Sequence, residues 1–436
     1  MSIDPLPLDW HAARIAERRR AFLSPVLDTF VAYESLPVWR RGEGAYLWDA
    51  SGRRHLDAMA QNVCISVGYR HPGVDAAVRS QLDEIQHVTT AYAHPQPGHL
   101  AEELVARLPA GHDWVVHFVN SGAEAIDLAV LAARVHTGHF EVLTLRDAYH
   151  GMHFTAMAAT GIGHAHQPVP PAPGFVSVIA PHSYHGPFGG DAAPYLDELS
   201  RTIAAATSGD VAAMIVEPIQ GYGGIVEMPQ GYLAGAAQRA REAGGLFIVD
   251  EVQTGFGRTG SHFWGFEAHG VVPDAIVMSK GIGNGFPIAA MVTRREIAES
   301  MTRRMFFNTY GANPVSCAAA RAVLRAIDDE ALRANADRCG KAFERAFAAL
   351  GERHASIGDV RGRGLLRGVE LVGDRRARTP DAAAAARAQS LLREEGVIVG
   401  LCGAGHNVLK INPPLCVTED DIANLAAACD AALCRL

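Results

Sequence analysis

The stretch at 246–280 constrains the fold of this chain more than any other. An apolar run at 246–249 ends in Asp250, and a second apolar run at 275–278 is soon followed by Lys280. Both runs are typical of strands buried in a parallel sheet. A buried acid is unfavourable unless a cation or a hydrogen-bond donor meets it. The two strand ends therefore predict a ligand site at one edge of an open α/β sheet.

Lysine is scarce in this chain, which draws attention to Lys280. The other lysines are Lys341 and Lys410, and all other residues in the Lys and Arg total are arginines. Lys341 lies in a polar helical pattern that indicates a surface position. An amine that forms an imine must be able to lose its proton, which arginine cannot do. Lys280 is therefore the first candidate to hold an aldehyde cofactor, although the local sequence also fits an ordinary strand-end lysine.

A strand, a turn and a helix follow one another within 114–136. The apolar run at 114–119 predicts a strand, and 125–136 has the apolar periodicity of a helix. Between them, Ser121 and Glu124 form a capping-box pattern. A helix that begins in this way leaves backbone N–H groups pointing outward and can bind an anion. The same pattern also fits a capped helix without a ligand.

Further apolar runs at 141–145 and 212–216 predict strands that precede Tyr149 and Glu217. A tyrosine ring can stack on a planar heteroaromatic group. His150, next to it, is assigned a supporting role. Together with a predicted strand at 288–293, the alternation of strands and helices indicates an α/β protein.

The two ends of the chain have a different pattern. Residues 1–70 are expected to form a helix followed by short strands, with a hairpin turn at 49–52. Near the other end, Thr379 and Pro380 are expected to cap a helix that runs through the alanines at 382–386.

Composition limits the classes of function. A chain of 436 residues exceeds one typical core, so two lobes are expected. A net charge of −8 argues against nucleic-acid binding, and no apolar stretch is long enough to span a membrane. Seven cysteines without a secretory signal favour a reducing compartment, here the cytoplasm. Neither these cysteines nor the histidines within 161–190 have metal-type partners, so no metal site is predicted.

Three motifs carry a resemblance to a known family. They are D-E-V-Q-T-G-F-G-R-T-G from Asp250, S-K-G-I-G-N-G-F-P from Ser279 and S-G-A-E-A from Ser121. Together they resemble the class III aminotransferases, which are pyridoxal-phosphate (PLP) enzymes of fold type I, over most of the chain. The resemblance implies a large domain with a mainly parallel sheet sandwiched by helices, and a small α+β domain built from both termini. The expected boundaries are 1–70, 71–325 and 326–436.

The resemblance also implies roles for individual residues. Lys280 would hold the cofactor as an imine and then shuttle a proton, Asp250 would keep the pyridine nitrogen protonated, and Glu217 would face the substrate side of the pocket. The remaining cofactor contacts would be Ser121, Gly122 and Ala123 at the phosphate, Tyr149 and Val252 against the ring, Gln253 at the ring hydroxyl, and Thr309. In relatives this threonine reaches the partner's cofactor phosphate, which implies a homodimer with shared active sites.

The predicted reaction moves an amino group from an amino acid or amine donor to a 2-oxo acid such as pyruvate or glyoxylate. Lys410 departs from the family pattern, because many relatives have an arginine there that grips the substrate's α-carboxylate. Lysine offers a point charge instead of a planar fork. Lys410 would therefore hold a substrate carboxylate less selectively, or the site would serve a different anion.

The alternative function is phosphate elimination. The segments F-F-N-T-Y-G-A-N-P and N-V-L-K-I-N-P-P resemble the phospho-lyase branch of the family, whose members act on phosphoethanolamine or phosphohydroxylysine. The alanine–glyoxylate branch shares the first pattern and the D-V-R-G-x-G-L run. Ala312 stands where a second glycine is usual. Aminotransfer is the main prediction, with the phospho-lyase as its alternative.

Overall fold

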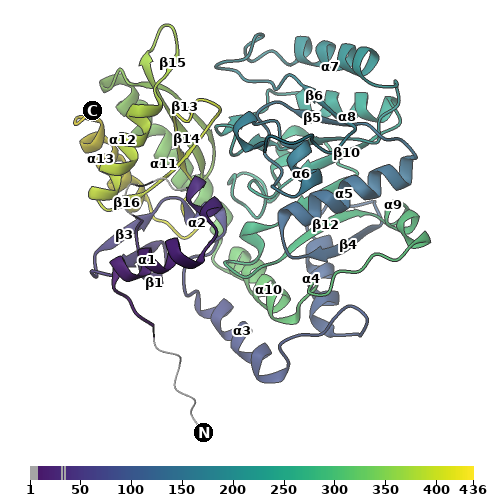
Figure 1. Cartoon of the computed structure of the whole chain (residues 1–436), viewed down its shortest axis with the longest axis horizontal. Helices are drawn as coiled ribbons and strands as arrows, with labels where there is room; N and C mark the ends of the chain where they lie inside the picture. The colour runs from purple at the N-terminus through teal and green to yellow at the C-terminus, as the bar shows by residue number, and fades with distance from the viewer. Residues whose placement is uncertain (1–7, 31–32, 34–35) are drawn as a thin grey trace.

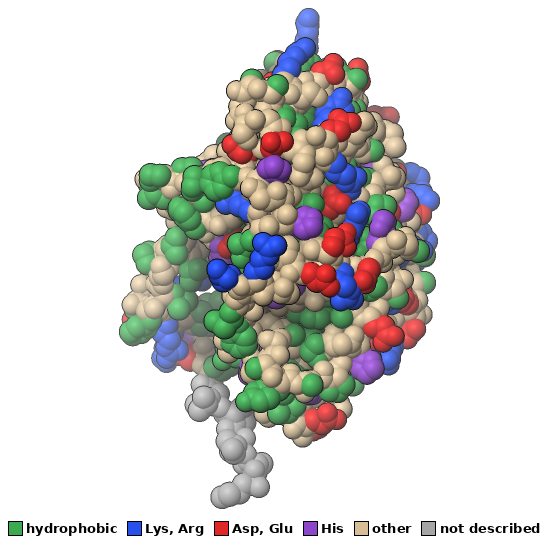
Figure 2. Space-filling view, turned by 90° about the vertical axis from the view of Figure 1, so that its right-hand side faces the viewer, with side chains coloured by type: hydrophobic (Ala, Val, Ile, Leu, Met, Phe, Trp, Pro, Cys, Tyr) green, Lys and Arg blue, Asp and Glu red, His purple; other side chains and the backbone are tan. Residues whose placement is uncertain are grey.

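The computed structural model describes residues 8–30, 33 and 36–436. Figure 1 shows two lobes, one built from the middle of the chain and the other from segments near both ends. On the face seen in Figure 2, acidic, basic and histidine side chains intermingle, while hydrophobic side chains gather towards its left and lower edges.

The larger lobe contains a mixed sheet in which most strands are parallel. Strand β12 runs antiparallel to both of its neighbours, and the other adjacent pairs are parallel. The order across the sheet is β4 (Trp114–Val119), β12 (Ala289–Arg294), β11 (Ala275–Met278), β10 (Leu246–Asp250), β7 (Ala213–Val216), β5 (Val142–Leu145) and β6 (Phe175–Val178). The strands predicted from the apolar runs are thus confirmed.

Both faces of this sheet are buried, which explains the continuous apolar runs. In β10, Phe247 and Val249 belong to one hydrophobic cluster, whereas Ile248 belongs to another. Successive side chains of a strand point to opposite faces, so both faces need apolar residues. Helix α5 (Gly122–Thr137) packs on one face, while α7 (Ala192–Ala206) and α8 (Tyr232–Glu242) pack together beside the neighbouring strands.

The smaller lobe joins strands from both ends of the chain. Leu56 pairs with Val397 in a parallel arrangement. One sheet has the order β1 (Trp39–Glu43), β2 (Tyr46–Asp49), β3 (Arg54–Asp57) and β16 (Val397–Ile398). The other has the order β13 (Ile357–Arg363), β14 (Leu366–Asp374), β18 (Val408–Ile411) and β17 (Gly400–Cys402), with β15 (Thr379–Pro380) paired to β14.

Helices complete both lobes. Helices α11 (Leu332–Arg353), α12 (Ala382–Glu394) and α13 (Glu419–Leu433) belong to the smaller lobe, as Figure 1 shows. Helix α10 (Pro314–Asp329) packs against α3 (Pro72–Glu84) and α4 (Pro95–Val105). It is continuous across residue 325, where the sequence suggested a boundary.

One predicted helix cap is wrong. Thr379 and Pro380 extend the sheet as β15, and Asp381 caps α12 by accepting a hydrogen bond from the Ala384 N–H at 2.9 Å. The Asp381 carboxylate stands directly before the helix, so it reaches the free N–H groups of the first turn. At α5 the predicted N-cap is correct, since Ser121 Oγ accepts from the Glu124 N–H at 3.2 Å.

The loop after β10 is held by a buried acid. The carboxylate of Glu251 accepts hydrogen bonds from Thr254 Oγ1 at 2.6 Å, from the Gly265 N–H at 3.0 Å and from the Phe266 N–H at 2.8 Å. Its side chain is fully buried, so these donors supply what water would otherwise provide.

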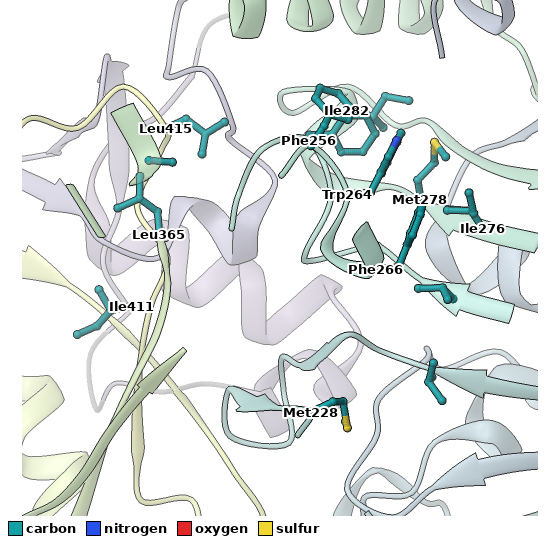
Figure 3. Close-up of a cluster of buried hydrophobic side chains, with 14 of the residues drawn as sticks. Met228, Phe256, Trp264, Phe266, Ile276, Met278, Ile282, Leu365, Ile411 and Leu415 are labelled. Carbon is teal, nitrogen blue, oxygen red and sulfur yellow. The ribbon is translucent and has the colours of Figure 1, made fainter. Parts of the chain in front are cut away.

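Aromatic rings then fix this loop beside the lysine. Phe256 and Trp264 meet edge to face, with ring centroids 5.1 Å apart, and Figure 3 shows both beside Ile282. Ile282 is fully buried and ends the short 3₁₀ turn that begins at Lys280. Packing in the core thus anchors the chain directly after this lysine.

Candidate active site

A cavity of about 510 Å³ opens where the parallel strands of the large sheet end. Its lining includes most of the residues predicted from the sequence, namely Ser121, Gly122, Ala123, Tyr149, Glu217, Asp250, Val252, Gln253 and Lys280. Among the described residues, the cavity lining does not include Thr309 or Lys410. Separate strands therefore deliver nine of the eleven predicted site residues to one place.

Lys280 lies at a sharp reversal of the chain. Its backbone has φ 47°, a left-handed conformation that costs an ordinary residue about 1–2 kcal/mol. The hydroxyl of the preceding Ser279 donates to the Ile288 carbonyl at 3.2 Å, which ties the end of β11 to the residue before β12. A Cβ at Gly283 would lie 2.0 Å from the Phe286 carbonyl oxygen. The reversal therefore requires glycine at 283. The left-handed backbone of Lys280 is strained, and such strain is typical of functional sites.

The N-terminus of α5 borders the same cavity. Ser121 caps the helix, and the backbone N–H groups of Gly122 and Ala123 belong to a first turn that has no intrahelical acceptors. A Cβ at Gly122 would lie 3.3 Å from Val252 Cγ2, so this turn lies directly against the residue after β10. The arrangement suits an anion.

Asp250 is paired with His150 at the end of β10. His150 Nδ1 lies 2.7 Å from Asp250 Oδ2, and the Val252 N–H donates to Asp250 Oδ1 at 3.0 Å. Burial alone would lower the pKa of His150, but the hydrogen bond and the negative charge of Asp250 raise it above its usual value. The contact with Asp250 therefore favours the charged form of His150, and both side chains are buried. The sequence assigned His150 only a supporting role.

Glu217 is held by backbone donors. Its two carboxylate oxygens accept from the Tyr149 N–H at 3.0 Å and the Gly221 N–H at 2.9 Å. Burial raises the pKa of Glu217 to about 7, although the charge of His150 acts in the opposite direction. This carboxyl group therefore titrates near neutral pH.

Lys410 lies behind Gln253. Its ammonium donates to Gln253 Oε1 at 2.7 Å and to Asn62 Oδ1 at 2.9 Å.

Thr309 is instead exposed on the surface, beside the exposed Tyr310.

The sequence did not single out the segment around Asn62. The backbone of Ala60, Gln61, Asn62 and Val63 has φ values of 47°, 48°, 62° and 72°, which forms a left-handed turn without glycine. Cys64 follows the turn and lines the cavity. No local signal indicates this turn, because residues other than glycine, asparagine and aspartate rarely adopt such φ values.

These groups fit one cofactor. A lysine amine suits an aldehyde, the α5 N-terminus suits a phosphate, and a buried carboxylate suits a protonated ring nitrogen. The apolar side chain of Val252 and the ring of Tyr149 also line the cavity. Fold and site together define an enzyme that binds a phosphorylated aromatic aldehyde.

Comparison with known proteins identifies the family. The model described as aminotransferase class-III matches residues 31–433, so the chain belongs to the class-III aminotransferases. An Arabidopsis thaliana protein named alanine–glyoxylate aminotransferase 2 homolog 2, mitochondrial, is 43% identical over 434 residues, which cover 97% of this chain and 87% of that protein.

Solved structures are similar over nearly their full length. An amine transaminase from an uncultivated Pseudomonas species, in its PLP-bound form, has a TM-score of 0.87 at 32% identity, covering 92% of this chain and 95% of that one. A phospholyase from Arthrobacter, in complex with phosphoethanolamine, has a TM-score of 0.88 at 33% identity, covering 97% and 100%. The fold is therefore fold type I, and the cofactor is pyridoxal 5′-phosphate.

The titration of Glu217 gives a pH-dependent prediction. Its folded-state pKa of about 7 lies above the usual 4.5, so it stabilises the fold below pH 4.5 and this contribution is lost as pH rises through 7. Replacing it by Gln removes this dependence. We expect the free energy of unfolding of the parent to fall relative to Glu217→Gln by roughly 2–3 kcal/mol between pH 4.5 and pH 8.

Urea unfolding of both cofactor-free proteins across this range measures the difference. Glu102→Gln, at an exposed position of α4, serves as the control and should follow the parent at every pH. A constant difference between Glu217→Gln and the parent would contradict the raised pKa.

Proposed function

We propose that this protein transfers an amino group from an amino acid or amine donor to a 2-oxo acid such as pyruvate or glyoxylate. The observation that carries the proposal is one cavity lined by Lys280, by Asp250 paired with His150, and by the N-terminus of α5. The names of the class-III relatives support the same reaction type.

The cofactor, when bound, supplies an aldehyde that combines with amines and a ring that accepts electrons from a bond broken at the substrate carbon. Lys280 provides the amine for attachment. As a free amine, Lys280 would also be the base that removes a proton from the substrate carbon and later gives it back. The lysine is suited to this because its amine can exist without a proton, unlike an arginine.

The buried acid pair has a separate role. Asp250 would hold a proton at the ring nitrogen by its charge, and His150 orients this carboxylate through its 2.7 Å contact. Ser121, Gly122 and Ala123 would hold the phosphate, Tyr149 and Val252 would pack against the ring, and Gln253 would bond the ring hydroxyl. Glu217 faces the substrate.

A second candidate function is phosphate elimination from a phosphorylated amine such as phosphoethanolamine. Lys410 replaces the arginine found in many relatives, and the similarity to the Arthrobacter phospholyase supports this alternative. Proton removal by Lys280 would begin both reactions, so products distinguish them.

We propose a cytoplasmic protein with domain boundaries at 1–70, 71–325 and 326–436. All seven cysteines, each within the described residues, are free, which supports a reducing compartment. The Arabidopsis relative is named mitochondrial, so its compartment differs from this proposal. In the described part of the chain, no helix has both the length and the apolar character needed to cross a membrane.

The reaction is tested by measuring both possible products. With L-alanine and glyoxylate, we expect the purified holoenzyme to form pyruvate and glycine in equal amounts. With phosphoethanolamine, we expect no release of inorganic phosphate. Phosphate release without amino transfer to any 2-oxo acid would establish the alternative and reject the main proposal.

The attachment residue is tested by Lys280→Ala. We expect turnover to fall by about a thousandfold or more, because the variant lacks both the attachment amine and the base. After borohydride reduction of the parent holoenzyme, peptide mass spectrometry should find the cofactor on Lys280. Lys341→Ala is the matched control and should keep parental turnover. A reduced adduct on Lys341 or Lys410 would exclude the assignment.

We also propose a homodimer in which Thr309 reaches the partner's cofactor phosphate. Phe307 and Tyr310 beside it are 51% and 62% exposed, and Met305 is 93% exposed, which supports a covered surface here. Light scattering should therefore give twice the chain mass, and Thr309→Val should weaken cofactor binding about tenfold by losing one hydrogen bond to a charged group. A fully active monomer at assay concentration would refute this arrangement.

A further inference from the structure

Lys410 is a buried cation that donates hydrogen bonds to two side-chain amides. It comes from β18, its side chain is almost wholly buried, and its ammonium donates to the side-chain oxygens of Gln253 and Asn62. Burial lowers the pKa of Lys410 to about 8. Lys410 does not line the cavity, so its direct contact with the lining is the hydrogen bond to Gln253, while its charge also acts on Lys280 and Glu217.

The ammonium determines which end of the Gln253 amide faces it. A lysine ammonium has donors and no acceptor, so the amide must turn its oxygen towards Lys410. The amide nitrogen is then directed away from Lys410. Gly221 packs against the amide group as a whole, since a Cβ at this glycine would lie 2.4 Å from Nε2, 2.5 Å from Cδ and 2.6 Å from Oε1 of Gln253. Gln253 lines the cavity, and it therefore presents N–H donors there rather than an acceptor.

Asn62 holds the other side of the ammonium, and its position depends on the left-handed turn at 60–63. The carboxylate of Asp57 organises this turn by accepting from the Met59 N–H at 3.1 Å and from Gln61 Nε2 at 3.4 Å. Tyr69 donates its hydroxyl to the same carboxylate at 2.5 Å. Asparagine tolerates a left-handed backbone better than most residues, which suits it to this position.

We propose that Lys410 is a positioning residue: its ammonium, held by Asn62, fixes the Gln253 amide so that its N–H group donates to the ring oxygen of the cofactor. A donor at this position favours the anionic form of that oxygen. The nearby positive charge strengthens the donor, because linked hydrogen bonds polarise one another.

The inference rests on the proposed contact of Gln253 with the ring oxygen, but not on which reaction follows. It differs from the sequence-based prediction that Lys410 holds a substrate anion. The two roles predict different effects. A positioning role changes cofactor binding and the cofactor's absorption spectrum without substrate, whereas a substrate contact changes KM alone.

The experiment compares Lys410→Met, Gln253→Leu and the double variant with the parent. Methionine is unbranched like lysine and ends one atom short of the ammonium position, with no charge and no donor. Each holoenzyme is scanned for its absorption spectrum, and the cofactor dissociation constant is measured by titrating the cofactor-free form. We expect each single variant to bind the cofactor about tenfold more weakly, since one charge-linked hydrogen bond is lost. The double variant should show no further loss, because the two residues act as one unit.

Two variants provide the controls. Lys341→Met makes the same substitution at an exposed lysine paired with Asp337, and it should match the parent in both measurements. Lys410→Arg keeps a charged donor and should recover most of the cofactor affinity lost in Lys410→Met. If Lys410→Met fails to fold, Asn62→Gly removes the second acceptor while keeping a backbone that tolerates φ 62°. Asn62→Gly should bind the cofactor more weakly than the parent. Its absorption spectrum should change in the same direction as that of Gln253→Leu.

Parental cofactor affinity and an unchanged spectrum in Lys410→Met or in Asn62→Gly would overturn the inference. If the only change is a higher KM for the amino donor, Lys410 contacts the substrate and the inference is wrong. Additive losses in the double variant would also overturn it, by showing that Lys410 does not act through Gln253. None of these results depends on whether the parent transfers nitrogen or releases phosphate, so the proposed reaction is tested separately.

Discussion

Buried carboxylates at the ends of two neighbouring strands impose the arrangement of everything around them. Val216 and Val249 pair across β7 and β10, so Glu217 and Asp250, which follow them, leave the sheet side by side. Each acid loses its hydration and needs donors in return. Backbone N–H groups meet Glu217, while His150 and a backbone N–H meet Asp250. Tyr149, His150 and Val252, which supply three of these donors, also line the cavity.

The sequence predicted those features that arise from local patterns. Strand β10 is apolar at every position before Asp250 because clusters cover both faces of the sheet, and this makes the strand recognisable without a structure. The N-cap at Ser121 is equally local, since one side chain and one helix turn suffice. Long specific motifs then connected these elements to a family and, through it, to a cofactor.

Features that depend on distant residues could not be predicted in this way. Residue spacing alone does not indicate that Lys410 meets Asn62, which is 348 positions away. The 2.7 Å contact of His150 with Asp250 likewise joins two separate strand ends. The error at Thr379 has another cause, because strand pairing with β14 competed with helix capping at this residue, and Asp381 caps α12 instead. Tertiary pairing decided that competition.

The shared sheet of the smaller lobe has a consequence for how the protein is made. Strand β3 is synthesised early, but its partner β16 appears only after most of the chain has been translated. Contacts of such long range form slowly, and domains fold as their segments emerge. The larger lobe can therefore collapse on the ribosome while the segment at 54–64 still lacks its partner strand. A nascent chain stalled before residue 397 would lack the strand that pairs with β3, so the segment leading to Cys64 at the cavity would have no partner on that side.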